Sequence, residues 1–413
     1  MTASEPRGHW VLRSHCECLV FPSPHASLAL PTRHGRLQWH LRGVSGRHGD
    51  GYQRQVAAAL LTTVRAWTAR GACFSRLVLD DLLVKAGHLA PASRSALVRG
   101  LEQVLRFQYG LTAVSLENCR LDRGEGTRLL RALAVSSAHT LQQLHLQGAF
   151  AAGQNPLLED STPEPFRGAP AFRSKMACRG DYEQALSAFS ALRFLALDHG
   201  QLSSEVLVWL VSRRPASLSF LQLLCLEREL ESPAVPDGVW RLAAALQPQL
   251  SVCIVIEGVA EDKRTKRFLS PFMPLRHFSV SSGLQAWRRA PWDFHVTLRR
   301  LAHTHGRQLE SIYIHLHRSR EDLDSMLAEM FDLFPRLESL EFTGLVQDTR
   351  TIEGICSILA TAPRCARHLR IRAQESSTGD RRRMREIIAS LQEEYQERLE
   401  QVGVVLDLAT YRA

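Results

Sequence analysis

Long hydrophobic runs are missing from this chain of 413 residues, although hydrophobic residues make up 45% of it. No apolar run approaches the roughly 18 residues that cross a membrane, so we expect no membrane partner. The N-terminal segment holds Arg7 and Arg13 but no apolar block followed by a small-residue cleavage site, so we expect no signal peptide. The nine cysteines are an odd number without regular spacing. They therefore favour reduced thiols in the cytoplasm or nucleus.

Catalytic motifs are also missing. The sequence holds no nucleophile elbow, phosphate-binding loop, dinucleotide-binding fingerprint or two-histidine zinc helix. An extended repeat sheet also offers no ready enclosed pocket. We therefore predict a non-catalytic binding subunit that holds no cofactor.

Three pairs of metal-binding side chains raise the question of a metal site. They are His303 with His305, His315 with His317, and Cys16 with Cys18. Structural zinc sites have four ligands at characteristic spacing, and no matching second set accompanies any of these pairs. We therefore predict no metal.

The positive charge of the chain bears on its partners. The net charge of +9 favours acidic partners in general but does not single out nucleic acid. Basic runs lie at residues 263–267 and 381–385, and neither has the aromatic residues or motif typical of a nucleic-acid surface. Glutamates follow the second run, as in a solvated, salt-bridged helix. Nucleic-acid binding is therefore our weakest hypothesis.

The most informative stretch is residues 111–121, which read LTAVSLENCRL. They follow the leucine-rich-repeat pattern L-x-x-L-x-L-x-x-N/C-x-L, with Val114 in the second leucine position. Degenerate variants recur along the chain, spaced by 25 to 51 residues. The first anchors of these units are Phe74, Leu111, Leu141, Leu192, Leu218, Leu250, Leu275, Leu309, Leu337 and Ala366.

Between these units the apolar period becomes helical, as at residues 56–67, 97–105 and 323–333. Strand followed by helix, repeated with short connections, gives a parallel sheet with helices on one side. We predict an α/β leucine-rich-repeat solenoid, whose sheet lines a horseshoe and whose helices lie on the convex side. Such a shape usually holds a protein partner.

We expect three regions along the chain. Residues 1–36 form an irregular tail, and residues 37–377 form the degenerate repeats. Residues 378–413 form a cap, with a polar helix over 380–402 that ends near Gly403 and a strand over 404–408. Glycines and prolines in residues 148–180 predict a loop insertion. It is either a solvated addition or a flap that contacts a ligand.

The residues between the buried positions of each strand predict the lining of the concave face. They are Val78, Ser115, His145, Ala196, Gln222, Ile254, Ser279, Tyr313, His315, Glu341 and Arg370. The last units hold the chemically richest set, so that end suits an acidic or aromatic partner better than the start, which is lined by Ala and Ser. The alternative, which holds equally for any one of these residues, is an ordinary solvated strand position. Our candidate partner-binding residues are Tyr313, His315, Glu341, His368, Arg370 and Arg372.

The order of these features resembles one family, the F-box proteins with degenerate leucine-rich repeats. The similarity covers about residue 39 to the C-terminus, and is best at residues 111–146, 274–280, 309–342 and 364–371. It implies the substrate-recognition component of an SCF-type (cullin–RING) E3 ubiquitin ligase. There the F-box docks on a Skp-type adaptor, and the repeats hold a protein substrate.

An F-box would fall near residues 1–36, which show no Leu-Pro start followed by amphipathic helices. Docking on the adaptor and cullin would therefore require an F-box upstream. Our leading hypothesis is a ligase substrate receptor. The alternative is a leucine-rich-repeat scaffold or inhibitor that binds a protein without ligase function.

Overall fold

The computed structural model describes residues 35–38, 62, 74–80, 91–151, 180–212, 218–226, 234–258, 268–282, 294–316, 322–361, 365–374 and 381–411. Within these residues, twelve strands form one sheet in which strand order follows sequence order, and every neighbouring pair is parallel. The strands are β1 (Gly35–Gln38), β2 (Phe74–Val78), β3 (Ala113–Ser115), β4 (Gln143–His145), β5 (Phe194–Asp198), β6 (Phe220–Leu226), β7 (Ser251–Glu257), β8 (Leu275–Ser282), β9 (Ser311–Leu316), β10 (Ser339–Gly344), β11 (His368–Gln374) and β12 (Val405–Tyr411).

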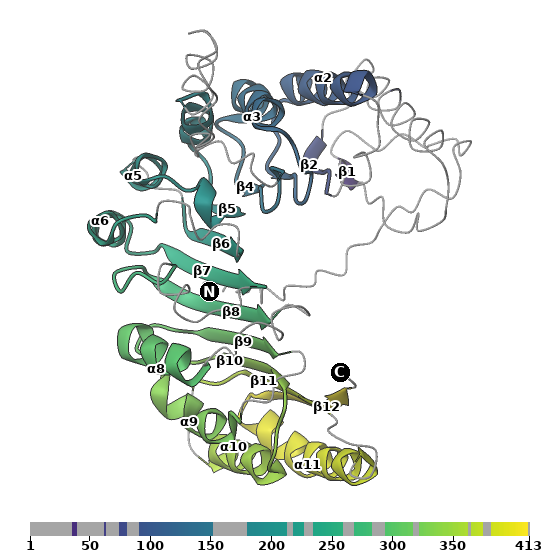
Figure 1. Ribbon diagram of the computed structural model, residues 1–413, viewed down its shortest axis with the longest axis vertical. Coiled ribbons are helices and arrows are strands. Elements are labelled where there is room, and N and C mark those ends of the chain that lie inside the picture. The colour runs from purple at the N-terminus through teal and green to yellow at the C-terminus, as the bar shows by residue number, and fades with distance from the viewer. Residues whose placement is uncertain are drawn as a thin grey trace, which may run out of the picture.

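The helices follow the strands and lie on the outer side of the curved sheet (Figure 1). In the described part of the chain they are α2 (Pro91–Phe107), α3 (Arg123–Ser137), α5 (Ser204–Ser212), α6 (Asp237–Leu246), α8 (Phe294–His305), α9 (Asp324–Leu333), α10 (Thr349–Thr361) and α11 (Arg381–Gln401), with a short 3₁₀ turn, η2 (His199–Gln201). Residues 180–188 are also helical. The molecule is an open arc with strands inside and helices outside, which confirms the predicted solenoid.

The core is one continuous layer between sheet and helices. All ten anchors predicted from the sequence lie in it, and none is more than 5% exposed. Each buried leucine contributes roughly 1.5–3 kcal/mol relative to an exposed one. Because every unit shares its apolar face with its neighbours, the sheet is stable only as a stack.

The unit at residues 111–121 shows how the repeat is built. Val114 and Leu116 are buried in the core, as predicted. The thiol of Cys119 donates a hydrogen bond to the Leu79 carbonyl of the preceding unit, at 3.1 Å. Asp122 then begins α3 with a capping box, in which its carboxylate accepts from the Glu125 amide. Side chains at fixed pattern positions therefore join one unit to the next and begin the helix.

The predicted loop at 148–180 begins later than expected. Phe150 is 3% exposed and forms an isolated parallel β-bridge with Leu121. The Gly148 amide donates to the buried Asp198 carboxylate at 2.8 Å. Residues 148–150 therefore belong to the repeat stack, while 152–179 lie outside the described residues. The expected tail before residue 35 and most of the helix at 56–67 also lie outside them.

At the C-terminal end, α11 packs on β12 and α10 through the apolar face expected for a cap. Leu391, Tyr395 and Leu399 are all buried in the core. Gly403 has φ +80°, a left-handed conformation that ends the helix and is nearly free of strain only for glycine. The chain then turns directly into β12, which pairs with β11 along its whole length.

Candidate functional site

The concave face is an array of side chains in rows that cross the strands. In parallel strands held in register, residues that are paired across strands point to the same side. One row runs from Ser115 through His145, Ala196 and Gln222 to Cys253. The next row contains Tyr313, Glu341, Arg370 and Asp407 on the last four strands. Contacts along these rows define what the face can bind.

An aromatic row crosses the middle of the concave face. It consists of His145, Phe194, Phe220 and His277, whose ring centroids are 4.7, 5.2 and 5.3 Å apart in turn. The first two contacts are stacked and the third is tilted. All four side chains are half-buried, so they offer apolar surface without lying in the core.

Small residues beneath the rings make these contacts possible. Phe220 and His277 lie on β6 and β8, yet their rings meet over β7. There β7 presents only Ser251 and Cys253, which are 9% and 6% exposed. Burial raises the pKa of the Cys253 thiol to about 12, so the thiol beneath the aromatic row is neutral and unreactive. A larger residue at either position would separate the two rings.

The aromatic row also contains a serine–histidine contact that invites a catalytic interpretation. The Ser311 hydroxyl is hydrogen-bonded to the His277 Nδ1. Burial, helped by the nearby Arg276, lowers the pKa of His277 to about 4. A general base works best with a pKa near the operating pH, and Ser311 is itself buried. The pair is therefore better suited to fixing the ring than to nucleophilic catalysis.

Carboxylates lie at the N-terminal end of the aromatic row. Asp80 Oδ1 accepts a hydrogen bond from the Ser115 hydroxyl and another, at 3.0 Å, from the Glu117 amide. The Glu117 carboxylate lies 3.1 Å from His145 Nδ1. Burial and the neighbouring Glu117 raise the pKa of Asp80 above its usual value, against the effect of its hydrogen bonds. This end of the face is acidic.

The C-terminal end of the face carries a compensated ionic cluster. Arg370 lies between two carboxylates, with its Nε 2.6 Å from Asp407 and its Nη1 3.5 Å from Glu341. His315 Nε2 lies 3.6 Å from the other oxygen of Glu341. These groups are partly exposed, so the pairs add little stability. They do fix the side chains and neutralise much of the positive charge that the sequence suggested for this end.

All six candidate residues lie on the concave face of β9, β10 and β11, and they form two adjacent rows and a flanking position. Tyr313, Glu341 and Arg370 share one row, and His315 and Arg372 flank Thr343 in the next. His368 pairs with Ser339 at the amino end of β11. Arg372 makes no hydrogen bond or ion pair with any residue that the structure describes.

One predicted lining residue is wrong. Ile254 is 0% exposed and points into the core, while Cys253 and Val255 face the concave side. Every residue of β7 from Val252 to Ile256 is apolar, so the sequence offers no alternation to choose the face. The register between β7 and β8 shifts between Val252 and Cys253. The buried positions of β7 therefore fall one residue away from those that the repeat pattern predicts.

The sequence prediction missed Phe194 and Phe220. They lie two residues before Ala196 and Gln222, which were predicted to face the concave side. Because alternate residues of a strand share a face, the same pattern places both rings there. On β5 and β6 only one residue per strand was assigned to the face, and this left the aromatic row out of the prediction. Asp80 and Asp407 lie outside the repeat pattern itself.

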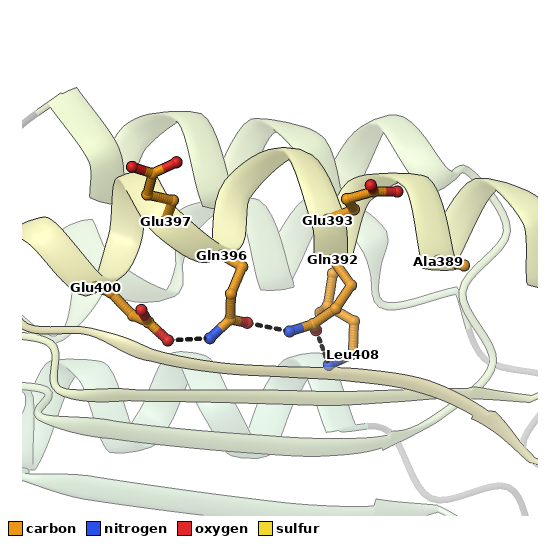
Figure 2. A pocket seen from close by; sticks show the side chains of 7 residues that line it. All are labelled: Ala389, Gln392, Glu393, Gln396, Glu397, Glu400 and Leu408. Carbon is orange, nitrogen blue, oxygen red and sulfur yellow. Dashed lines mark hydrogen bonds between the residues drawn. The ribbon is translucent and has the colours of Figure 1, made fainter.

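A second surface feature lies at the C-terminal end of the solenoid, between α11 and β12. It is a groove of about 570 Å³ whose polar lining comes from one helix face (Figure 2). The residues that line it include Gln392, Glu393, Gln396, Glu397, Glu400 and Leu408. The groove is open to the surface. Along it, side chains of α11 form hydrogen bonds with the outer edge of β12, the last strand of the sheet.

Gln392 occupies the place that one residue of a further strand would take. The Val405 amide donates toward β11, so the Leu406 carbonyl and Leu408 amide point to the outer edge of β12. Gln392 Oε1 accepts from Leu408 at 2.7 Å, and its Nε2 donates to Leu406 at 3.1 Å. A residue of a parallel neighbour would bond the same two groups. The side chain therefore covers the edge of the sheet.

The orientation of this amide is fixed by Glu400. An ionised carboxylate only accepts hydrogen bonds, so Gln396 must donate its Nε2 to Glu400 (Figure 2). The Gln396 Oε1 then accepts from Gln392 Nε2, which leaves Gln392 Oε1 toward the Leu408 amide. Three side chains one helical turn apart therefore act as one directed chain of hydrogen bonds.

Three further findings concern the family of the chain, metal binding and membrane spans. No protein-family model matches the chain. Among the described residues, no three His, Cys, Asp or Glu side chains gather in a way that could hold a metal ion. None of the helices in the described part is long and apolar enough to cross a membrane.

Proposed function

We propose that this protein is a binding subunit that holds a protein partner on the concave face of its repeat sheet. The observation that carries the proposal is the half-buried aromatic row of His145, Phe194, Phe220 and His277. Aromatic side chains supply large contact areas and are enriched at protein interfaces. Carboxylates and an ordered ionic cluster flank the row, as polar rims flank apolar interface centres.

We further propose that this binding selects substrates for an SCF-type (cullin–RING) ubiquitin ligase. The support is the resemblance of the repeats to F-box receptors, together with a partner-sized binding face. In this role the chain would be non-catalytic and would reach a Skp-type adaptor and a cullin through an F-box. Its place would be the cytoplasm or nucleus, where that machinery works.

The second candidate is a repeat scaffold or inhibitor without ligase function. The observation that favours it is the concave face itself, whose aromatic row and flanking ionic cluster suit a protein partner without any further module. In this case the same concave face would bind the partner, and no adaptor would associate.

One experiment separates these functions. The tagged chain is purified from cells in a wild-type form, a concave variant (Phe194→Thr with Phe220→Thr) and a convex control. The control, Leu242→Thr with Leu246→Thr, changes two residues of α6 that are each 44% exposed. Thermal melting checks that all three forms fold.

The ligase role predicts that adaptor and cullin associate with all three forms, while one substrate is lost only from the concave variant. A partner lost from the concave variant without any adaptor in the wild type would support the scaffold. A partner that all three forms retain would show that the concave aromatic row is not the binding surface.

A further inference from the structure

The acidic residues and the aromatic row on the concave face form one continuous strip. The strip starts at Asp80 after β2, passes through Ser115 and Glu117, and reaches His145 on β4. From His145 it continues through the stacked rings to His277 on β8. Every step is a hydrogen bond or a ring contact, so the side chains are held in place before any partner arrives. We call this the acidic–aromatic strip.

Among the described residues, no Arg or Lys forms an ion pair with Asp80 or Glu117 at the acidic end of the strip. Arg76 lies on the same face of β2, in the row of Ala113 and Gln143, and makes no ion pair with either carboxylate. In the part of the chain that the structure describes, His145 is the only basic group that acts on the Asp80 carboxylate. Asp80 and Glu117 are held together because Asp80 accepts from the Glu117 amide. The C-terminal cluster differs, since there Arg370 already lies between its two carboxylates. An added cation would therefore gain more at Asp80 and Glu117.

The aromatic part of the strip fits apolar side chains. Phe194 and Phe220 are stacked and half-buried. Ala196, Gln222 and Cys253 form the next row on this face, and Leu224 and Val255 lie in the row beyond it. Apart from His145, the other side chains of the two nearest rows on this face from β4 to β7 are uncharged, namely Gln143, Ala196, Gln222, Ser251 and Cys253. Asp198 lies in the row of Leu224, but it is 1% exposed, and its carboxylate accepts hydrogen bonds from the Gly148 amide and the Gln201 side chain. An apolar segment placed here would bury surface without covering an unpaired charge.

From these contacts we propose that the acidic–aromatic strip binds an extended segment of a protein partner, in which a Lys or Arg side chain adjoins several apolar side chains. The cation lies against Asp80 and Glu117, and the apolar side chains cover Phe194 and Phe220. This inference rests on the proposed protein-binding function and adds the chemistry of the partner.

The dimensions and charge of the strip agree with this occupant. From β2 to β8 the strip crosses six strand spacings, or roughly 29 Å, which an extended segment of about nine residues spans. Nucleic acid is a poor alternative, because its phosphates would meet Asp80 and Glu117 first. The strip therefore selects against polyanions even though the chain as a whole carries a net charge of +9.

The test uses fluorescein-labelled peptides of about nine residues, a length taken from the strand spacing. The first has one Arg followed by alternating Leu and Ser, the second replaces Arg with Glu, and the third replaces every Leu with Ser. Fluorescence anisotropy measures their binding to the full chain. We expect the Arg–Leu peptide to bind about tenfold more tightly than the Glu–Leu peptide, the effect of one ion pair of about 1.4 kcal/mol. The Leu-free peptide should not bind measurably.

Variants locate the interaction. Asp80→Asn with Glu117→Gln should abolish the preference for Arg and leave the weaker binding of the leucine side chains unchanged. The local structure should be kept, because the side-chain oxygen of Asn can still accept the hydrogen bond from Ser115. The matched control, Glu393→Gln with Glu397→Gln, removes two exposed carboxylates from α11 and should preserve the preference. Phe194→Thr with Phe220→Thr should abolish binding of both leucine peptides.

Equal binding of the Arg and Glu peptides would overturn the inference, as would a preference that survives in the Asp80 and Glu117 variant. Neither result would remove the proposed function, which is judged by loss of the cellular partner from the concave variant. Conversely, a missing adaptor would refute the ligase role and leave the peptide result unchanged.

Discussion

Replacement of Gln392 by leucine tests how the solenoid ends. The side chain bonds the Leu406 carbonyl and the Leu408 amide at the outer edge of β12. Leucine keeps the length of the apolar stem and a high helix propensity, so α11 itself should be unaffected. The change therefore isolates the two hydrogen bonds that replace a further strand.

The size of the effect follows from those bonds. Each intramolecular hydrogen bond contributes a net of about 0.5–1.5 kcal/mol, so removing both costs about 1–3 kcal/mol. Water can reach the edge of β12 and replace part of the lost hydrogen bonding, so we expect the cost of Gln392→Leu to be about 1–2 kcal/mol. This is about a 5–30-fold change in an opening equilibrium.

Two measurements follow the edge directly. Hydrogen exchange should show the Leu408 amide exchanging about 5–30-fold faster in Gln392→Leu, as that free energy implies. Size-exclusion chromatography with light scattering should show stronger self-association, because the open edge can accept a strand from a second copy. The control is Glu397→Leu, which alters the same groove at a side chain that points away from β12 (Figure 2).

The outcome can refute the interpretation. If Leu408 exchanges at the same rate in Gln392→Leu as in the wild type, its amide is not protected by Gln392. If Glu397→Leu has an equal effect, the cause is a general change in the helix surface and not the loss of a strand mimic.

Three further predictions concern stability. Leu116→Asp places a charge in the core, where Leu116 is 2% exposed, and should lower the free energy of unfolding by several kcal/mol; an unchanged melting curve would refute the strand register. Gly306→Ala should lower the free energy of unfolding by about 1–3 kcal/mol, because a Cβ would lie 2.4 Å from the Ala302 carbonyl oxygen. Gly354→Ala, in the open middle of α10, should raise it by about 0.5–1 kcal/mol. A urea titration measures both changes. Burial lowers the pKa of His199 to about 4 from an ordinary 6.5, so the unfolded chain takes up the proton first. Stability should therefore be full above pH 6.5 and fall between pH 6.5 and 4. His199→Gln should remove part of that slope, because burial also lowers the pKa values of His277 and His305 to about 4.

The sequence was a good guide to the units of the fold. Leu111 and Leu141 could be identified as anchors because leucine positions in a repeat are set by local periodicity. The same reasoning placed α9 and α11, whose apolar residues recur every three or four positions. It failed at Ile254, where an unbroken apolar run hides the direction of each side chain.

The binding face was only partly predictable. His145 and Arg370 were assigned to it from alternation alone, and both lie there. Their partners were not predictable, because Glu117 and Asp407 are brought to them by strand register. Chain spacing between units varies, so the pattern does not say which residue of one strand pairs with which residue of the next.

By itself, the sequence determined that this protein is a stack of strand–helix units with an exposed inner face, since period and composition act within a single unit. Only the tertiary structure decided which side chains meet across units. The stacking of Phe194 on Phe220, their link to His277 over the small residues of β7, and the cover that Gln392 gives to β12 depend on register. Register is set by the packing of the whole stack, and no single unit encodes it.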